Sequence, residues 1–198
     1  MQSIITKNEK ETKKVAADLA KKLIQQRFRN ESQAIRRNSR FYRGSSTKSG
    51  LRRVKKSGEA LILALQGELG AGKTTFIKGF SKALKIIEKV LSPTFVLIHR
   101  HHLKSGNLYH IDAYRLKSEK DLLKLNIKEI FNNPKNIVLI EWADRVKKVI
   151  PKSAIWIYFE HLDKNPEVKP SVPMESRILD KVGTLYEAGK RKITIIER

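Results

Sequence analysis

The stretch that decides the fold is Gly67-Glu68-Leu69-Gly70-Ala71-Gly72-Lys73-Thr74, which follows the apolar run 61–65 almost directly. It matches the pattern G-x-x-x-x-G-K-[ST], a phosphate-binding loop between a strand and a helix. Its glycines allow the backbone to turn its amides toward phosphate oxygens. Lys73 can reach the β- and γ-phosphates of a nucleotide, and the Thr74 hydroxyl can bind Mg²⁺. We therefore predict that residues 67–75, ending at Thr75, bind ATP with Mg²⁺.

A P-loop ATPase also needs a carboxylate at the end of a neighbouring buried strand, where it holds the metal or positions water. Glu141 follows the apolar run 137–140, as in a Walker B strand, although Asp is commoner there. Asp112 ends the strand-like run 109–111 in the same way. Either acid could instead be an exposed carboxylate at a strand end. We take Lys73, Asp112 and Glu141 as candidate catalytic residues, and Thr74 and Glu141 as candidate metal ligands.

Apolar patterns outline alternating strands and helices around this loop. The continuous apolar runs 61–65 and 137–140 are typical of strands buried on both faces. Helices are expected at 9–26, opened by a capping box from Thr6 to Glu9, and at 73–84 and 118–131. The remaining expected strands are 3–5 at an edge, 94–98 and 108–111 joined by a hairpin turn at 104–107, 155–159 and 193–196. The fold class is therefore α/β, a P-loop NTPase-type sandwich with a mostly parallel sheet and an inserted antiparallel hairpin.

Length and charge suggest one domain with two additions. The chain has 198 residues and a formal net charge of +22. Residues 28–57 lack sustained periodicity and are rich in Arg, Ser and Asn, which predicts a flexible basic insertion. Residues 162–190 form a longer loop that contains several prolines and a possible short helix at 177–187. The insertion could bind tRNA or an acidic protein, with Phe41-Tyr42 stacking on a base, or it could simply be solvated.

The chain also lacks the marks of an exported or membrane protein. It has no cysteine, and no apolar run approaches the ~20 residues of a membrane-spanning helix. Its N-terminal residues have neither the basic start nor the apolar stretch of a signal peptide. We therefore expect a cytoplasmic protein without a membrane partner.

Four blocks together resemble the bacterial TsaE family. They are the loop 67–75, then Ser92-Pro93-Thr94-Phe95, then 109–116 (Tyr109-His110-Ile111-Asp112-Ala113-Tyr114-Arg115-Leu116), and then Glu141-Trp142. The blocks occur in family order and cover roughly residues 58–160. The long basic stretch before the loop and the extended region 162–190 depart from the family, but neither touches a motif.

The resemblance implies a function that composition could not provide. TsaE proteins bind ATP and Mg²⁺, hydrolyse ATP slowly and act with the TsaB–TsaD pair, which places a threonylcarbamoyl group on the adenosine beside the anticodon of tRNA. By resemblance, Lys73 holds phosphate, Thr74 and Glu141 bind Mg²⁺, and Asp112 is essential for hydrolysis. The resemblance also implies a switch-like loop at 92–94, Trp142 beside the site, and adenine near residues 6–8 and the last strand.

Other functions stay open at this point. A metabolite kinase would need lid arginines, which the sequence does not display recognisably, and a GTPase would need the base-reading motif N-K-x-D, which is absent. A module that holds nucleotide without hydrolysis is compatible with the same motifs. His99, His101 and His102 suggest a metal site, but no carboxylate or cysteine lies nearby in the sequence, so surface positions on the hairpin are expected.

Overall fold

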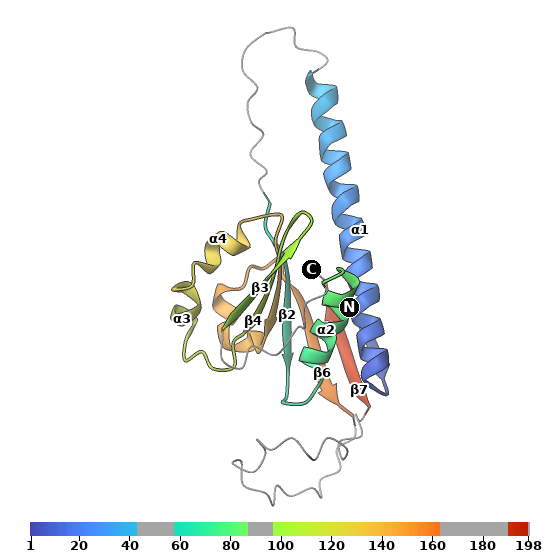
Figure 1. Ribbon diagram of the computed structural model, residues 1–198, viewed down its shortest axis with the longest axis vertical. Helices are drawn as coiled ribbons and strands as arrows, with labels where there is room; N and C mark the ends of the chain where they lie inside the picture. Colours follow the sequence, from blue (N-terminus) through green and yellow to red (C-terminus); the bar gives the residue numbers. More distant parts are fainter. Residues whose placement is uncertain (43–57, 87–96, 163–189, 198) are drawn as a thin grey trace, which may run out of the picture.

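A seven-stranded sheet forms the centre of the protein (Figure 1). The computed structural model describes residues 1–42, 58–86, 97–162 and 190–197. The strands are β1 (Gln2–Thr6), β2 (Leu61–Gly67), β3 (Ile98–Leu103), β4 (Gly106–Asp112), β5 (Ile137–Glu141), β6 (Ile155–His161) and β7 (Arg191–Ile196). The helices are α1 (Glu9–Tyr42), α2 (Lys73–Ala83), α3 (Glu119–Leu123), α4 (Ile127–Phe131) and the 3-10 helix η1 (Ala143–Val149).

The strand order is β1-β7-β6-β2-β5-β4-β3. The four middle strands, β6, β2, β5 and β4, are parallel, and the outer pairings β1–β7, β7–β6 and β4–β3 are antiparallel. The predicted α/β class, the parallel centre and the β3–β4 hairpin are therefore confirmed. β2 lies between β5 and β6, so the loop that follows it opens at the carboxyl edge of the sheet, where parallel α/β proteins bind ligands.

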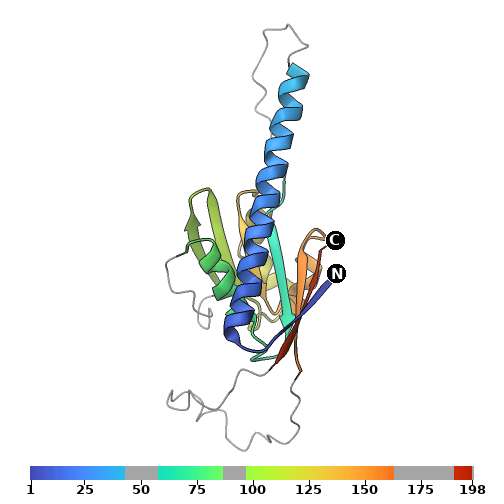
Figure 2. The same ribbon diagram turned by 90° about the vertical axis from the view of Figure 1, so that its right-hand side faces the viewer.

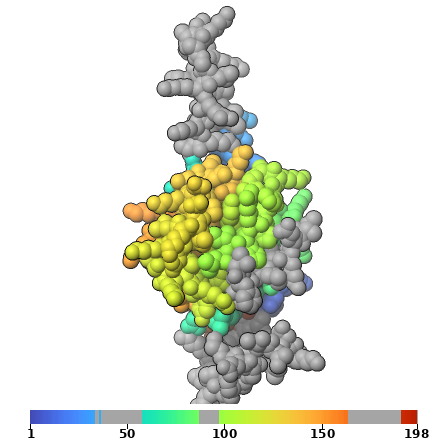
Figure 3. Space-filling view, turned by 60° about the vertical axis from the view of Figure 1, so that its left-hand side comes forward, coloured from blue at the N-terminus to red at the C-terminus, as the bar shows by residue number. Residues whose placement is uncertain are grey.

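Helices cover both faces of the sheet (Figures 1 and 2). On one face, α1 and α2 pack against a core that includes Leu63, Leu139 and Ile157. On the other face, α3, α4 and η1 pack against a core that includes Ile62 and Ile140. Figure 3 views the molecule from the side of α3, α4 and the β3–β4 hairpin. Alternate residues of the buried strands therefore enter opposite cores, which explains their continuously apolar sequences.

Helix α1 is much longer than the sequence pattern predicted. It begins at Glu9 as expected, but it continues to Tyr42, so the predicted end near residue 26 and the irregular structure of 28–42 are wrong. The apolar stripe ends where the helix leaves the body, yet loss of the stripe does not end a helix. No Gly or Pro occurs before Gly44, and Arg and Gln are good helix formers. The rest of the expected insertion, 43–57, lies outside the described residues.

Smaller differences have local causes. The α1 N-terminus is capped by Asn8, whose Oδ1 accepts the Glu11 amide at 2.9 Å, so the expected capping box from Thr6 is wrong. The helix expected at 118–131 is two short helices, because Asn126 adopts a left-handed conformation with φ 52°. Within the described residues the first hairpin strand begins at Ile98, and residues 94–96 of the expected strand lie outside them. Residues 87–96 and 163–189, with the expected helix at 177–187, lie outside the described residues.

None of the helices that the structure describes is both long enough and apolar enough to cross a membrane.

Candidate functional site

The predicted phosphate-binding loop has backbone conformations that only glycine adopts readily. Gly70 and Gly72 have φ values of 76° and 98°. A Cβ on Gly67 would stand 2.5 Å from the carbonyl oxygen of Phe159 in the neighbouring strand β6. The loop therefore packs closely against the edge of the sheet and leads into α2, whose first backbone amides have no hydrogen-bond partner within the helix. Backbone amides and a helix N-terminus together favour an anion at this position.

Lys73, the first residue of α2, reaches back across the loop. Its Nζ donates hydrogen bonds to the carbonyl oxygens of Gly67 at 2.7 Å and Glu68 at 2.8 Å. It also lies 3.9 Å from the centre of the Trp142 ring. Burial lowers the pKa of Lys73, and the nearby carboxylates Glu141, Asp112 and Asp144 oppose that effect. The ammonium group is thus held at the loop, where phosphate oxygens can replace the two carbonyls as its partners.

Glu141 is fixed by residues from two other elements. The Thr74 hydroxyl lies 3.0 and 2.9 Å from the two carboxylate oxygens of Glu141. On the other side, His110 Nε2 lies 2.8 Å from Oε1 of the same carboxylate. The His110 side chain is 0% exposed and that of Glu141 is 4% exposed, so water is excluded from this contact. A carboxylate only accepts, so His110 donates from Nε2 and the Glu141 carboxylate is held in one orientation.

Asp112 stands opposite Glu141 in the β4–β5 register. Its Oδ1 accepts a hydrogen bond from the Tyr114 amide at 3.0 Å. Burial is the main cause that raises the pKa of Asp112, and the charge of Glu141 adds to it. The Tyr114 amide, His110 and Lys73 act in the opposite direction. A carboxylate with a raised pKa takes up a proton more readily near neutral pH, which suits a proton acceptor.

These residues line one cavity of about 340 Å³ at the carboxyl edge of the sheet. Its size is in the range of sites that hold small molecules. Tyr114 and Trp142 form one wall, with ring centres 4.9 Å apart, and Arg145 lies 5.1 Å from the centre of the Tyr114 ring. The residues that line it are Leu69, Gly70, Gly72, Lys73, Thr74, Thr75, Asp112, Tyr114, Arg115, Glu141 and Trp142.

The donor set at this cavity suits Mg²⁺. A hydroxyl oxygen and a carboxylate oxygen, from Thr74 and Glu141, are the hard ligands that Mg²⁺ takes alongside water and phosphate oxygens. Within the described ranges, no group of three or more His, Cys, Asp or Glu side chains could hold a metal. The hairpin histidines therefore form no such site. The expectation that all three lie on the surface is wrong for His101, which is 6% exposed because it stands opposite the core residue Leu108.

The structure brings Lys73, Thr74, Asp112 and Glu141 together, as the motifs suggested, with Trp142 beside Lys73. Residues 92–94 lie outside the described residues. Thr6, near which adenine was expected, is buried and bonds to Thr12, and it does not line this cavity.

Sequence reasoning assigned no site role to His110 or Arg191. Alternation along β4 was a usable signal for His110, because it lies two residues before Asp112 and so faces the same side. Arg191 begins β7, is buried, and reaches the loop so closely that a Cβ on Gly72 would lie 2.6 Å from its Nη1. No local pattern could have indicated that contact, because the two residues are far apart in the chain.

The comparisons with known proteins agree with the motifs. Residues 6–169 match the family model described as Threonylcarbamoyl adenosine biosynthesis protein TsaE. A tRNA threonylcarbamoyladenosine biosynthesis protein TsaE from Bacillus subtilis is 41% identical over 96 residues, which cover 48% of this chain and 59% of that protein. The protein of that name from Haemophilus influenzae is 32% identical over 105 residues, covering 53% of this chain and 66% of the relative. For Treponema pallidum the identity is 38% over 111 residues, covering 56% of this chain and 81% of the relative.

The aligned part thus spans less than two thirds of the first two relatives. Among solved structures, the crystal structure of YdiB from Bacillus subtilis superposes with a TM-score of 0.57 at 22% identity, covering 99% of this chain and 84% of that chain. At this identity the likeness supports the fold alone. The family model, in contrast, spans most of the sequence, and the chain therefore belongs to the TsaE family of threonylcarbamoyl adenosine biosynthesis proteins.

Proposed function

We propose that this chain binds ATP with Mg²⁺ in the 340 Å³ cavity and hydrolyses ATP slowly. In this proposal it serves tRNA threonylcarbamoyladenosine biosynthesis in the cytoplasm as a partner of the TsaB–TsaD complex, not as the transferase. The observation that carries the ATPase is the convergence of Lys73 and Thr74 with two carboxylates, Glu141 and Asp112, on one cavity. The pathway is supported by membership of the TsaE family.

Each residue of the cavity has a separate role in the proposed hydrolysis of ATP. The loop amides and the Lys73 ammonium bind the β- and γ-phosphates, where they stabilise the charge that develops during transfer. Thr74 and Glu141 hold Mg²⁺, which neutralises phosphate charge when it is bound. Asp112 orients a water molecule and takes its proton as the water oxygen forms a bond to the γ-phosphorus. The bond from that phosphorus to the β-phosphate oxygen breaks, and ADP and phosphate result.

His110 and Trp142 keep this arrangement in place. His110 holds the Glu141 carboxylate, and the Trp142 ring covers the Lys73 ammonium at 3.9 Å. Both contacts limit the freedom of a charged group before the substrate arrives. Such preorganisation reduces the reorganisation needed in the transition state.

Two measurements test the proposal. Calorimetric titration should give Mg²⁺-dependent ATP binding that Lys73→Ala weakens at least tenfold. Single-turnover hydrolysis, with TsaB and TsaD present, should be lost in Asp112→Asn and Glu141→Gln, while ATP still binds to Asp112→Asn. The matched control is Glu129→Gln, which removes an exposed carboxylate from α4, outside the cavity, and should leave both measurements unchanged.

The outcomes separate the parts of the proposal. If Asp112→Asn and Glu141→Gln hydrolyse ATP at the wild-type rate, the catalytic roles are wrong, and the chain is a nucleotide-holding module or uses other groups. If ATP binds and turns over but the chain neither binds TsaB–TsaD nor increases formation of modified tRNA, the ATPase stands and the pathway role is wrong.

A further inference from the structure

Helix α1 extends beyond the domain that it covers. Its residues up to Leu23 pack into the core beside α2, and Arg27 then donates to the carbonyl oxygen of Asn136 at 3.3 Å. After that contact the helix rises past the end of the sheet, as both ribbon views show (Figures 1 and 2). Phe28 is 60% exposed, and the next arginine, Arg29, is also exposed. We call residues 28–42 the projecting helix; at 1.5 Å per residue they span about 22 Å.

The arginines of the projecting helix are not spread evenly around it. Of its four arginine positions, 29, 36 and 40 lie within an arc of about 40° on a helix with 3.6 residues per turn, and position 37 lies about 60 to 100° from them. Glu31, the one acidic residue of this segment, falls on the opposite side. Arg29 and Arg36 are exposed. Positions 29, 36 and 40 lie about 60 to 140° around the helix from Leu19 and Leu23, so this arginine face does not coincide with the face that enters the core.

The projecting helix is poorly stabilised in the isolated chain. Helices gain most of their stability from packing, and the projecting helix has left the surface against which α1 packs. The sequence of this segment is strongly basic, and a bound polyanion would offset that charge and release counterions at the same time. The arrangement therefore fits a helix that is completed by a negatively charged partner.

The residues of the projecting helix favour a nucleic acid over a protein as its partner. A protein partner would need an apolar strip, and a packed helix face carries three to four apolar residues per two turns. Here the apolar positions 28, 34, 35, 41 and 42 lie on the side of the helix opposite positions 29, 36 and 40, and they amount to roughly two to three per two turns, fewer than such a face carries. Arginine, in contrast, recurs on its face at intervals of ~6 and ~10 Å, which suits successive phosphate groups of a nucleic acid strand. The charge also continues in sequence, since residues 43–56 add only basic charges.

We propose that the arginine face of the projecting helix binds the phosphate backbone of RNA. Phosphate contacts of this type position an RNA without reading its sequence. The exposed Phe28, at the base of the helix, offers a ring on which an unpaired base can stack. This inference goes beyond the proposed ATPase and does not depend on it, because the projecting helix shares no residue with the cavity.

The test measures the salt dependence of RNA binding. The probe is an unmodified tRNA transcript with a fluorescent label, titrated with the full chain between 50 and 300 mM salt, a range chosen from the behaviour of phosphate contacts. The variant is Arg29→Gln/Arg36→Gln/Arg40→Gln, because Gln keeps the helix propensity of Arg. Three lost contacts should reduce the slope of log K against log salt by about 2 to 3, and affinity near 0.1 M salt should fall on the order of 100-fold.

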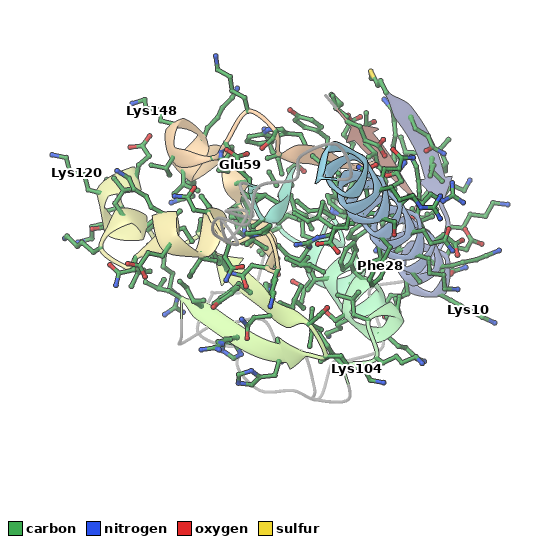
Figure 4. The ribbon with its side chains drawn as sticks, turned by 90° about the horizontal axis from the view of Figure 1, so that it is seen from above. Lys10, Phe28, Glu59, Lys104, Lys120 and Lys148 are labelled. Atoms are coloured by element: carbon green, nitrogen blue, oxygen red, sulfur yellow. The ribbon has the colours of Figure 1, made fainter. Side chains whose placement is uncertain are left out.

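A matched control removes the same charge elsewhere. Lys120, Lys128 and Lys148 are exposed on α3, α4 and η1. Figure 4 shows Lys120 and Lys148 on the side of the molecule opposite α1. The triple variant with Gln at these positions should keep the wild-type slope. Far-ultraviolet circular dichroism and ATP titration of both variants establish that the fold and the cavity are intact.

Several results would overturn the proposal. Salt-insensitive or absent binding of tRNA by the wild-type chain removes it outright. An equal loss in the two triple variants would mean that binding follows net charge and not the arginine face. Unchanged tRNA binding in the arginine variant, together with lost association with TsaB–TsaD, would assign the face to an acidic protein partner instead. None of these results bears on the ATPase, which is measured separately.

Discussion

Replacing His110 should loosen the Glu141 carboxylate, which we propose binds Mg²⁺, although His110 does not line the cavity itself. His110 Nε2 lies 2.8 Å from Oε1 of Glu141, and among the described residues the only other side-chain donor to this carboxylate is the Thr74 hydroxyl. Glu141 is 3% exposed, so water cannot take the place of a lost donor. His110→Leu therefore leaves a buried carboxylate with a single donor.

The magnitude follows from the charge of the acceptor. A hydrogen bond to a charged group contributes about 1.5 to 3 kcal/mol, and loss of one buried partner exposes the full desolvation cost of the other. We expect His110→Leu to lower the free energy of unfolding by about 2 to 3 kcal/mol. If Glu141 also turns away from Thr74, the same loss corresponds to roughly 30- to 150-fold weaker Mg²⁺-dependent ATP binding.

Two amide variants separate positioning from packing. The amide nitrogen of His110→Gln can approach the position of Nε2 and should recover much of the loss, whereas the shorter His110→Asn reaches only about as far as Nδ1 and should not. Urea denaturation measures stability, and calorimetric titration of ATP binding at a series of Mg²⁺ concentrations measures the site. A His110→Leu protein within about 0.5 kcal/mol of wild type, with an unchanged Mg²⁺ requirement, would refute the reasoning.

Three further predictions concern the cavity carboxylate and two glycines. The folded-state pKa of Asp112 is raised, so its ionised form opposes folding at neutral pH. Asp112→Asn should therefore increase the free energy of unfolding at neutral pH. Urea denaturation should show this gain vanish as the pH falls below about 4, where the carboxyl group is protonated in both states. A gain that is independent of pH would contradict this origin. Gly72 has φ 98°, and a Cβ added there would lie 2.6 Å from Arg191 Nη1. Gly72→Ala should therefore lower the free energy of unfolding by about 1 to 2 kcal/mol and abolish ATP binding in calorimetry. Gly79→Ala should lower the free energy of unfolding by about 1 to 3 kcal/mol, because the added Cβ would lie 2.5 Å from the Lys13 carbonyl oxygen between α1 and α2. This loss should exceed the gain from the better helix propensity of Ala. Equal or higher stability in urea would show that the two helices can move apart to accept the methyl group.

Much of the fold was predictable because its signals are local. A strand buried on both faces must be apolar throughout, so 61–65 and 137–140 could be identified without partners. The glycine loop requires glycine at the turns that bring its amides onto phosphate, so the loop, its lysine and its threonine were identified together. Asp112 and Glu141 followed from their places at strand ends. Each of these inferences depends on residues that are neighbours in the sequence.

The predicted ends of helices and the predicted exposure of one side chain were wrong where the local sequence is compatible with more than one structure. Helix α1 was expected to end with its apolar stripe, yet propensity alone carries it to Tyr42. The helix expected at 118–131 is interrupted at Asn126, one of the few residue types that enter the left-handed region readily. His101 was expected at the surface, although its register opposite Leu108 takes it inward. Periodicity describes a face but does not state how far a helix runs or which face is covered.

Local sequence was enough to identify the candidate site groups of this chain: a glycine-rich loop with its lysine and hydroxyl, and two carboxylates, each recognised by its immediate neighbours. How these groups meet depends on the tertiary structure. The parallel pairing of β2, β5 and β4 aligns Thr74, Glu141 and His110 within hydrogen-bonding distance, and the return of β7 brings Arg191 against Gly72. The physical reason is that register and strand order are fixed by burial of the whole sheet between two helical layers, and this free energy is shared by residues far apart in the chain.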